Sequence, residues 1–362
     1  MPTRREFLVQ SAVAGVVASE RTKSGDAPPS DRAIGAPDHG HYQIPNTELT
    51  VSRLAYGVSL WGKGWNSADY VPASVRAVRT AYENGITFFD TADVYAGGLA
   101  EMALGRFLSE TPGLRNRVVI QTKCGGDYIR VSPGDQIKLD SRGSSFGPEL
   151  DRKRIVLAVE GSLKRLGTDR LDILLLHICH PLTQPEEVAE AFDNLKDSGK
   201  VRYFGVSNYS AMQIALLKKH VRQPLVVSQN WLGLANCKLL AESASLGGLI
   251  DHCRINNISI QAYSPLKGGS VLNSPTLLNP SPDSPPEVKQ VAQLLQEISQ
   301  HHKANPSAIM LAWLLRHPAH IIPILGASNP NHIIENCLAN GVSLTHEEWS
   351  VLWHAAMKIQ NA

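Results

Sequence analysis

The sequence predicts an α/β protein: a (β/α)8 TIM barrel with a β-hairpin before its first strand and an extra helix after its last. Two observations lead to this prediction. Short apolar runs alternate with longer amphipathic segments, and eight strands of this kind occur along the chain. Apolar strands between amphipathic helices are typical of a buried parallel sheet, and eight such units close into a barrel. The length of 362 residues fits one barrel with insertions, and it would also fit two ordinary domains.

The predicted elements follow one another in a regular order. The hairpin is predicted from Tyr42–Ile44 and Leu49–Val51, with turn residues between them. The predicted barrel strands are residues 53–60, 87–90, 118–121, 173–176, 202–206, 226–229, 259–262 and 321–325. The predicted helices are residues 73–84, 99–109, 152–165, 186–198, 211–219, 246–256, 288–303, 307–317 and 331–339, and the extra C-terminal helix is 345–358.

Helix boundaries carry the residues that favour them. Pro185, followed by two glutamates, is typical of a first helical turn, where carboxylates face the positive end of the helix dipole. Gly199 is a stop signal after that helix. Asn305 with Pro306 predicts the start of a later helix. The Pro- and Ser-rich segment 279–286 is predicted to be a loop.

Composition excludes several function classes. Hydrophobic residues make up 43% of the chain and charged residues 19%, which argues against global disorder. The 35 basic and 33 acidic residues leave a net charge of +2, which is too balanced to indicate a nucleic-acid partner or a polybasic membrane surface. No internal apolar run approaches the roughly 18 residues of a transmembrane helix, so we expect no stable membrane insertion.

The N-terminus differs from the rest of the chain. The pattern Thr3-Arg4-Arg5-Glu6-Phe7-Leu8, followed by a weakly apolar stretch, is similar to a bacterial Tat signal, and residues 16–18 fit a cleavage site. We therefore expect a Tat signal peptide over residues 1–20, a linker over 21–41 and the barrel domain over 42–362. This implies the Tat export machinery as a partner and a periplasmic or exported protein. If the arginine pair is a chance feature of a disordered start, the protein is cytoplasmic.

The five cysteines do not indicate a disulfide framework. They contain no Cys-x-x-Cys pair and are widely spaced: Cys124, Cys179, Cys237, Cys253 and Cys337. We expect free thiols, although an oxidising compartment makes this expectation less safe.

Four polar residues indicate catalysis. Asp90, Lys123 and His177 each end an apolar run that is typical of a buried strand, and Tyr95 follows Asp90 closely. Titratable groups at the C-terminal ends of parallel barrel strands are typically catalytic. Singly, each has an ordinary structural interpretation as a helix cap, a core tyrosine or a surface lysine. Together in this order, the four favour an active site.

The four side chains suit proton delivery to a carbonyl oxygen. The phenol of Tyr95 is a weak acid, with an ordinary pKa near 10. An ammonium group such as that of Lys123 stabilises the phenolate and lowers this pKa, and Asp90 can hold Lys123 through an ion pair. His177 can donate a hydrogen bond to the carbonyl or assist proton transfer. Alkoxide charge would thereby be stabilised while a bound cofactor delivers hydride.

Three motifs resemble one known family. They are Asp-Thr-Ala-x-x-Tyr at 90–95 followed by Glu101-x-x-x-Gly105, Leu-Gly-Thr-Asp-Arg-Leu-Asp at 166–172 followed by Leu-Leu-Leu-His, and the segment Ser198–Tyr209. From about Tyr42 to its C-terminus, the chain resembles the aldo-keto reductases. The run 185–192 and the long segment after Lys123 are similar to a bacterial, broad-specificity branch. The resemblance implies a barrel oxidoreductase with Asp90, Tyr95, Lys123 and His177 as its catalytic residues.

The same resemblance implies NADP(H) as the cofactor, without a Gly-x-Gly-x-x-Gly fingerprint. Ser207, Asn208 and Gln229 match positions that hydrogen-bond the nicotinamide carboxamide, and Tyr263 matches the aromatic ring that stacks on the nicotinamide. Positions matching the pyrophosphate loop and the adenosine end are Ser264, Leu266, Gly268, Gly326, Ser328, Asn329, Glu335 and Asn336.

The chain departs from the family in three places. No Lys or Arg occurs between Arg316 and Lys358, where the family places a basic residue for the 2′-phosphate, so NAD(H) or dual use stays open. Lys267 could compensate. Ile-Cys-His at 178–180 replaces a common Arg-Pro-Asp, and Ser-Gln-Asn-Trp at 228–231 replaces Asn-Gln-x-Glu. The last two changes alter the rim of the expected substrate pocket.

Aromatic residues on the expected loops could line that pocket. Trp61, Trp65, Tyr128 and Trp231 are the candidates, and loop packing explains each of them equally well. A metal at His177-x-x-His180 with Cys179 is disfavoured, because an extended strand end does not bring these side chains to one tetrahedral point. No metal site is expected.

The sequence favours one function over two others. The first is an NAD(P)H-dependent oxidoreductase that reduces aldehyde or ketone carbonyls of small molecules to alcohols, with Tyr95 as the general acid. The second is an exported cofactor-binding sensor or partner protein on the same barrel with little turnover, since a periplasm has no obvious pool of reduced nicotinamide. A barrel hydrolase or lyase is weaker, because no nucleophile–base pair stands out.

Overall fold

The structure is a computed structural model that describes residues 40–59, 69–126, 150–241, 248–266 and 277–361. The described residues belong to one compact unit that begins at His39. The predicted signal peptide and linker lie outside the described residues, apart from the end of the linker. Trp61, Trp65, Tyr128 and Gly268 also lie outside them.

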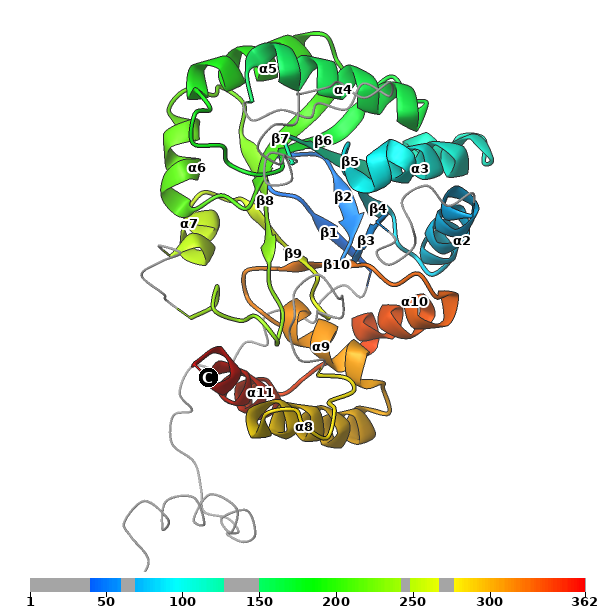
Figure 1. The fold of residues 1–362 in the computed structure, drawn as a ribbon, viewed down its shortest axis with the longest axis vertical. Helices are drawn as coiled ribbons and strands as arrows, with labels where there is room; N and C mark the ends of the chain where they lie inside the picture. The colour runs from blue at the N-terminus through cyan, green and yellow to red at the C-terminus, as the bar shows by residue number, and fades with distance from the viewer. Residues whose placement is uncertain (1–39, 60–68, 127–149, 242–247, 267–276, 362) are drawn as a thin grey trace, which may run out of the picture. The chain divides into compact units, whose positions relative to one another are not determined.

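Eight parallel strands form a closed barrel, which confirms the predicted fold (Figure 1). Their order around the barrel is β10-β3-β4-β5-β6-β7-β8-β9. The strands are β3 (Ala55–Gly57), β4 (Phe88–Asp90), β5 (Val119–Cys124), β6 (Leu171–Leu176), β7 (Val201–Ser207), β8 (Leu225–Trp231), β9 (Ser259–Tyr263) and β10 (Ile322–Leu325). The first strand is shorter than predicted, whereas β5 continues past Gln121 because Lys123 and Cys124 pair with β6.

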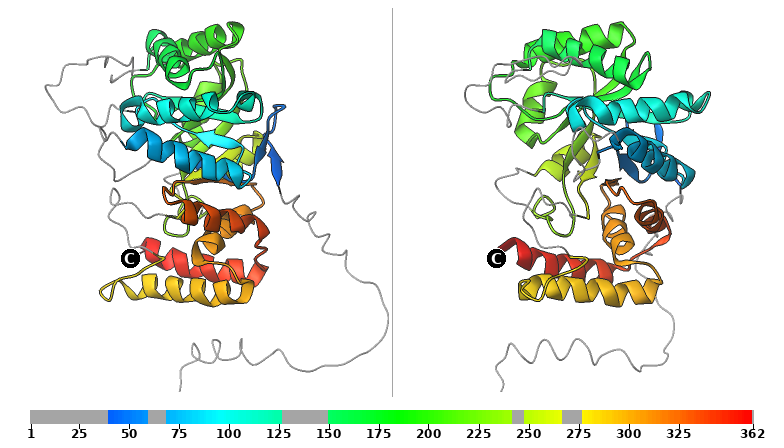
Figure 2. Two further views of the ribbon diagram at one scale, coloured as in Figure 1. Left: turned by 90° about the vertical axis from the view of Figure 1, so that its right-hand side faces the viewer. Right: turned by 45° about the vertical axis from the view of Figure 1, so that its right-hand side comes forward.

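The predicted hairpin is also confirmed. Strands β1 (His41–Gln43) and β2 (Thr50–Ser52) pair antiparallel and lie at one end of the barrel, as Figure 2 shows. Ile44, Leu49 and Val51 share a buried apolar cluster with barrel residues such as Phe88. Because these apolar side chains cover the barrel interior, the hairpin closes the end opposite the C-terminal ends of the strands.

The helices lie outside the strands and agree closely with the predicted ranges. They are α2 (Tyr70–Glu83), α3 (Leu99–Ser109), α4 (Arg152–Leu166), α5 (Pro185–Asp197), α6 (Ala211–Lys218), α7 (Leu249–Ile255), α8 (Pro286–His302), α9 (Pro306–Leu315), α10 (Pro330–Cys337) and α11 (His346–Asn361). Short 3-10 turns are η1 (Tyr95–Gly98), η2 (Leu114–Asn116) and η4 (Leu338–Gly341). The predicted cap at Asn305 forms, since its side chain accepts a hydrogen bond from the Ala308 N–H at 3.0 Å.

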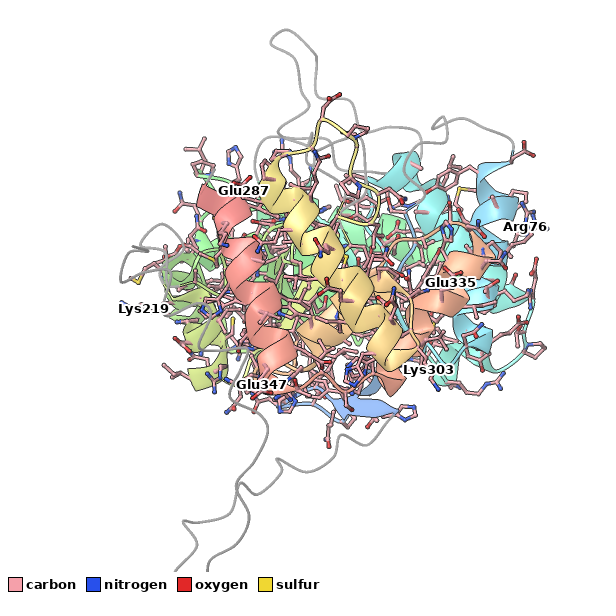
Figure 3. The ribbon with its side chains drawn as sticks, turned by 90° about the horizontal axis from the view of Figure 1, so that it is seen from below. Arg76, Lys219, Glu287, Lys303, Glu335 and Glu347 are labelled. Carbon is pink, nitrogen blue, oxygen red and sulfur yellow. The ribbon has the colours of Figure 1, made fainter. Side chains whose placement is uncertain are left out.

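The predicted extra C-terminal helix does not lie alone: it forms an additional layer together with α8. The predicted C-terminal helix is α11, and it packs side by side with α8 and antiparallel to it (Figure 3). Between β9 and β10 the chain forms both α8 and α9. Residues 308–315 of α9 are all buried, and a helix that is apolar all round needs cover on every side. The amphipathic α8 is therefore part of the cover, together with α11.

The Glu101-x-x-x-Gly105 motif joins two helices to the strand that carries Lys123. Glu101 is fully buried, and its carboxylate accepts hydrogen bonds from Thr122 Oγ1 and Arg165 Nε, both at 2.6 Å. A Cβ at Gly105 would lie 2.6 Å from the Arg165 carbonyl oxygen, so α3 can approach α4 this closely only with glycine there. The motif thus fixes β5 against the helix layer.

The aspartate that ends the 166–172 motif organises the opposite end of β5 and β6. Asp172 is 1% exposed and forms ion pairs with Arg115 and Arg202, each at 2.8 Å. It also accepts a hydrogen bond from the Ile120 N–H at 2.9 Å. Arg202 in turn pairs with Glu48 of the hairpin turn. A buried carboxylate with three donors is well compensated, and this motif is therefore structural.

Among the described residues, no helix is both long enough and apolar enough to cross a membrane.

Candidate active site

The four predicted catalytic residues lie at the C-terminal ends of three adjacent strands. Asp90 is the last residue of β4, Lys123 is next to last in β5, and His177 directly follows β6. Tyr95 begins the short turn η1 after β4. Because β4, β5 and β6 are parallel neighbours, their ends bring the four residues to one edge of the barrel.

Lys123 is the centre of this group. Its Nζ donates hydrogen bonds to Asp90 Oδ2 at 2.7 Å, to the Thr91 carbonyl oxygen at 2.8 Å and to Tyr95 Oη at 3.3 Å. The three donors of the ammonium group are thereby used. Lys123 is fully buried and Asp90 is 3% exposed, whereas Tyr95 is only partly buried. The ammonium group therefore connects an enclosed carboxylate to the hydroxyl of a partly buried tyrosine.

The electrostatics of Tyr95 differ in part from the expectation. Burial raises the pKa of Tyr95 above its ordinary value, and the Lys123 ammonium opposes that effect without cancelling it. Burial also opposes the charge on Lys123, but Asp90 and Tyr95 outweigh it and hold the pKa of Lys123 above its ordinary value. Lys123 is therefore charged and Tyr95 protonated at neutral pH, which is the state required of an acid.

His177 lies beside Tyr95. The centres of the two rings are 5.7 Å apart and their planes meet at 79°. The His177 backbone is fixed on both sides, because its N–H donates to the Cys124 carbonyl at 2.8 Å and its carbonyl accepts from Asn208 Nδ2 at 3.2 Å. A Cβ at Gly126 would lie 2.5 Å from His177 Nδ1. The absence of a side chain at this position leaves the ring its place next to Tyr95.

Three glutamines form one hydrogen-bonded group with Asp90: Gln229, which the sequence assigned to the cofactor, and Gln121 and Gln261. Gln121 Nε2 and Gln229 Nε2 donate to Asp90 Oδ1 at 2.6 and 3.0 Å, and both also donate to Gln261 Oε1 at 2.8 Å. Gln121 and Gln261 were missed. Gln121 shares strand parity with Lys123, and Gln261 with Tyr263. A polar residue two positions before a site residue in an apolar strand was the available signal.

The residues predicted for the nicotinamide end lie on the next arc of the barrel. Ser207 ends β7, Gln229 lies in β8, and Tyr263 ends β9. Asn208, at a φ of 60°, accepts a hydrogen bond from Tyr263 Oη at 3.0 Å and donates one to Ser207 Oγ at 3.1 Å. Burial raises the pKa of Tyr263 to about 12, so this ring stays neutral. Amide, hydroxyl and aromatic groups therefore lie at the same edge of the barrel as the four candidate catalytic residues, an arrangement that suits the predicted nicotinamide ring and its carboxamide.

Gln229 differs from the simple expectation of a free amide at the rim. Both hydrogens of its Nε2 are donated inside the barrel, to Asp90 and Gln261. Its side chain is only 1% exposed. A contact from Gln229 to a carboxamide would therefore use Oε1 as an acceptor.

The positions predicted for the rest of the cofactor differ in accessibility. Ser264, Gly326, Ser328, Asn329 and Glu335 are exposed, and Leu266 is half-buried. The exposed Asn329 side chain caps α10 by accepting from the Asn331 N–H at 3.0 Å. Asn336 is 2% exposed, so its side chain faces the protein rather than solvent. The exposed residues of this helix include His332 but no lysine or arginine.

Trp231 is the one predicted pocket residue within the described part of the chain. It is partly buried at the end of β8, where it pairs with Tyr263 of β9. It therefore lies at the same edge of the barrel as the four candidate catalytic residues. Trp61, Trp65 and Tyr128 lie outside the described residues.

The residues considered for a metal site at 177–180, and the cysteines, can be compared with the structure. His180 Nδ1 accepts a hydrogen bond from the Leu182 N–H at 3.2 Å. In the described ranges, the His, Cys, Asp and Glu side chains with ligand atoms close enough to share a metal are His301, His302 and Glu348, away from this site. None of the five cysteines forms a disulfide, and burial raises the pKa of the Cys124 and Cys179 thiols.

Comparisons with known proteins agree with this geometry. The Aldo/keto reductase family model matches residues 53–355. The 6-dehydroglucose reductase of Agrobacterium fabrum is 34% identical over 311 residues, which are 86% of this chain and 96% of the relative. Oxidoreductase YdhF of Escherichia coli is 32% identical over 297 residues, with 81% and 91% covered.

Solved structures show the same relationship. A thermostable aldo-keto reductase in complex with the inhibitor epalrestat superposes with a TM-score of 0.69 at 25% identity, over 87% of this chain and 99% of that one. An aldo-keto reductase from Klebsiella pneumoniae in complex with NADPH gives a TM-score of 0.64 at 26% identity, over 84% and 90%. With the family model and these relatives spanning most of its length, the chain belongs to the aldo/keto reductase family.

Proposed function

We propose that this protein reduces an aldehyde or ketone of a small molecule to the alcohol, with Tyr95 as the proton donor. The observation that carries the proposal is the position of Lys123 Nζ, which holds Asp90 on one side and the Tyr95 hydroxyl on the other. Burial keeps the Tyr95 phenol protonated, and the cation beside it stabilises the phenolate once the proton departs.

Each residue of the site has a different role in proton delivery. The Tyr95 hydroxyl donates its proton to the carbonyl oxygen as negative charge develops there. The Lys123 ammonium, 3.3 Å from the same hydroxyl, stabilises the phenolate that remains. The His177 ring, beside Tyr95, supplies a second hydrogen-bonding group for the carbonyl oxygen. A bound nicotinamide cofactor would supply the hydride.

Cofactor choice is part of the proposal. The NADPH bound by the Klebsiella neighbour supports NADP(H). The stretch between Arg316 and Lys358 nevertheless contains no lysine or arginine to pair with a 2′-phosphate. We therefore propose dual use, with NADH accepted at rates comparable to NADPH.

Export is a further part of the proposal, and it rests on the sequence alone. Arg4 and Arg5 followed by Phe7 and Leu8 support a Tat signal over residues 1–20. Fractionation of cells that express the wild type and Arg4→Lys/Arg5→Lys tests this. Periplasmic wild type beside cytoplasmic variant supports export, and a cytoplasmic wild type refutes it.

Turnover of NADPH and NADH with a reactive aromatic aldehyde tests the reductase. Tyr95→Phe should lower kcat by about 100-fold or more, because it removes the proton donor. Tyr82→Phe is the matched control, since Tyr82 packs on Phe107 outside the site, and it should leave kcat unchanged. Cofactor binding without turnover in the wild type would instead support the sensor function, and neither binding nor turnover would refute both.

A further inference from the structure

Four polar side chains form one connected group inside the barrel. They are Asp90 of β4, Gln121 of β5, Gln229 of β8 and Gln261 of β9, none more than 3% exposed. Asp90 is opposite Gln121 in the strand register, and Gln229 is opposite Gln261. Two strand pairs from opposite sides of the barrel therefore place their polar residues where the amides can meet.

The carboxylate determines the direction of every hydrogen bond in this group. An ionised Asp90 can only accept, so Gln121 and Gln229 must both present their NH2 groups to it. Their remaining hydrogens then point to Gln261, which receives both on Oε1 at 2.8 Å. Gln261 Nε2 returns a hydrogen bond to Gln121 Oε1 at 3.0 Å. Gln121 and Gln261 thus form a reciprocal amide pair with a single orientation.

This network fixes the orientation of the Asp90 side chain. Two amide donors occupy Oδ1, and the Lys123 ammonium occupies Oδ2 at 2.7 Å. If the carboxylate turned away from this position, all three hydrogen bonds would be lost inside the buried barrel, where an unmade bond is costly. Because Oδ2 is fixed, the ammonium group is fixed beside Tyr95.

We propose that Gln121 and Gln261 are positioning residues for the reaction: through Asp90 they hold the Lys123 ammonium within reach of the Tyr95 hydroxyl. The inference rests on the proposed function, because it assigns their role to that same proton donor. Both glutamines are fully buried, so we expect neither to contact a substrate. They act through a chain of hydrogen bonds: Gln261 orients Gln121, and Gln121 orients Asp90. Asp90 in turn holds the Lys123 ammonium beside Tyr95.

A second role would explain the burial of these glutamines without any positioning. Amides could simply fill the barrel and satisfy one another. That role predicts a loss of stability when they are replaced, but no change in how Tyr95 ionises. Positioning predicts that the proton affinity of Tyr95 changes, since a displaced ammonium stabilises the phenolate less.

Gln121→Met and Gln261→Met test the proposal, because methionine keeps the length of the side chain and removes the amide. Gln121→Met removes a direct bond to Asp90 and should lower kcat by about 10- to 100-fold. In a plot of kcat for reduction against pH, it should also move the fall at high pH (the alkaline limb) to higher pH. The Kd of the cofactor should change less than kcat. Gln261→Met, which leaves the bonds to Asp90 in place, should shift the limb in the same direction by less. It serves as the milder variant if Gln121→Met does not fold.

Thr122→Val is the matched control. Thr122 is the next residue of β5, equally buried, and also donates to a carboxylate, that of Glu101 on the helix side. This variant should lower stability without moving the alkaline limb. An unmoved limb in both glutamine variants, with only their stability lowered, overturns the positioning role.

A titration without substrate separates this inference from the proposed function. Ultraviolet absorbance of ionised tyrosine, taken as the difference between each protein and the same protein with Tyr95→Phe, isolates Tyr95 among the nine tyrosines. The midpoint should rise in Gln121→Met. If the wild type reduces no carbonyl but the midpoint still rises, the proposed function fails and the positioning network stands. If the wild type is active and neither the midpoint nor the limb moves, the network role fails alone.

Discussion

Lys123 Nζ lies 2.7 Å from Asp90 Oδ2 on the neighbouring strand, and both side chains are almost completely enclosed. Burial of an ion pair is favourable only where each charge keeps further partners. Lys123 also has the Thr91 carbonyl and the Tyr95 hydroxyl, while Asp90 has two glutamine amides. The pair therefore supports the barrel interior and the proton donor together.

Replacing one partner of this pair should cost more stability than replacing both. Lys123→Met leaves a buried carboxylate without its cation, and we expect the free energy of unfolding to fall by about 3–5 kcal/mol. Asp90→Asn/Lys123→Met removes both charges and should recover part of that loss while remaining inactive. Urea unfolding and kcat of the three proteins provide the measurement. A double variant no more stable than Lys123→Met would contradict the ion-pair account.

The pH dependence of carbonyl reduction should report Tyr95. Because burial raises the pKa of this phenol above its ordinary value of 10.0, with Lys123 opposing, the donor keeps its proton throughout the neutral range. We expect kcat for reduction to hold up to about pH 10 and to fall above it, as the phenol ionises. A kcat profile of the wild type, with circular dichroism at each pH to verify folding, tests this. A midpoint well below the ordinary value would mean that Lys123 outweighs burial.

Gly126→Ala should displace His177. The added methyl would lie 2.5 Å from Nδ1 of that ring, so the ring must move away from it. Since a displacement of about 1 Å can cost roughly 100-fold in rate, we expect a large loss of kcat. Gly341→Ala is the control, because nothing lies within 4 Å of a Cβ there. Equal activity of the two variants would show that the position of His177 does not matter.

Acid should weaken the contact between α8 and α11 through Glu348. Burial raises the pKa of Glu348, but the Thr345 N–H and the rings of His302 and His301 outweigh it and hold this pKa at about 2. A pKa depressed in the folded state gives stability that is present above about pH 4.5 and is lost as pH falls towards about 2. Urea unfolding across this range should show a flatter pH dependence for Glu348→Gln than for the wild type. Parallel curves would rule out this carboxylate as a source of acid sensitivity.

The sequence alone determined the barrel and the location of its chemistry. Apolar runs such as 173–176 predict buried parallel strands, because a strand is apolar throughout only where both of its faces are covered. A polar residue directly after such a run must lie at the barrel edge. Asp90, Lys123 and His177 could therefore be placed together without coordinates. The signal-like N-terminus and the pocket residues 61, 65 and 128 remain predictions.

Tertiary structure decided what depends on distant side chains. Gln121 and Gln261 are 140 positions apart in the sequence. Their amide groups meet only because the barrel closes and both side chains point into its interior. The direction of the Tyr95 pKa shift required the balance of burial against Lys123, since residue types give the sign of each effect but not which is larger. The pairing of α8 with α11 and the burial of Asn336 likewise depend on which helices pack together in the folded chain. Local patterns encode periodicity and chemistry, whereas contacts between remote segments are fixed only when the chain closes on itself.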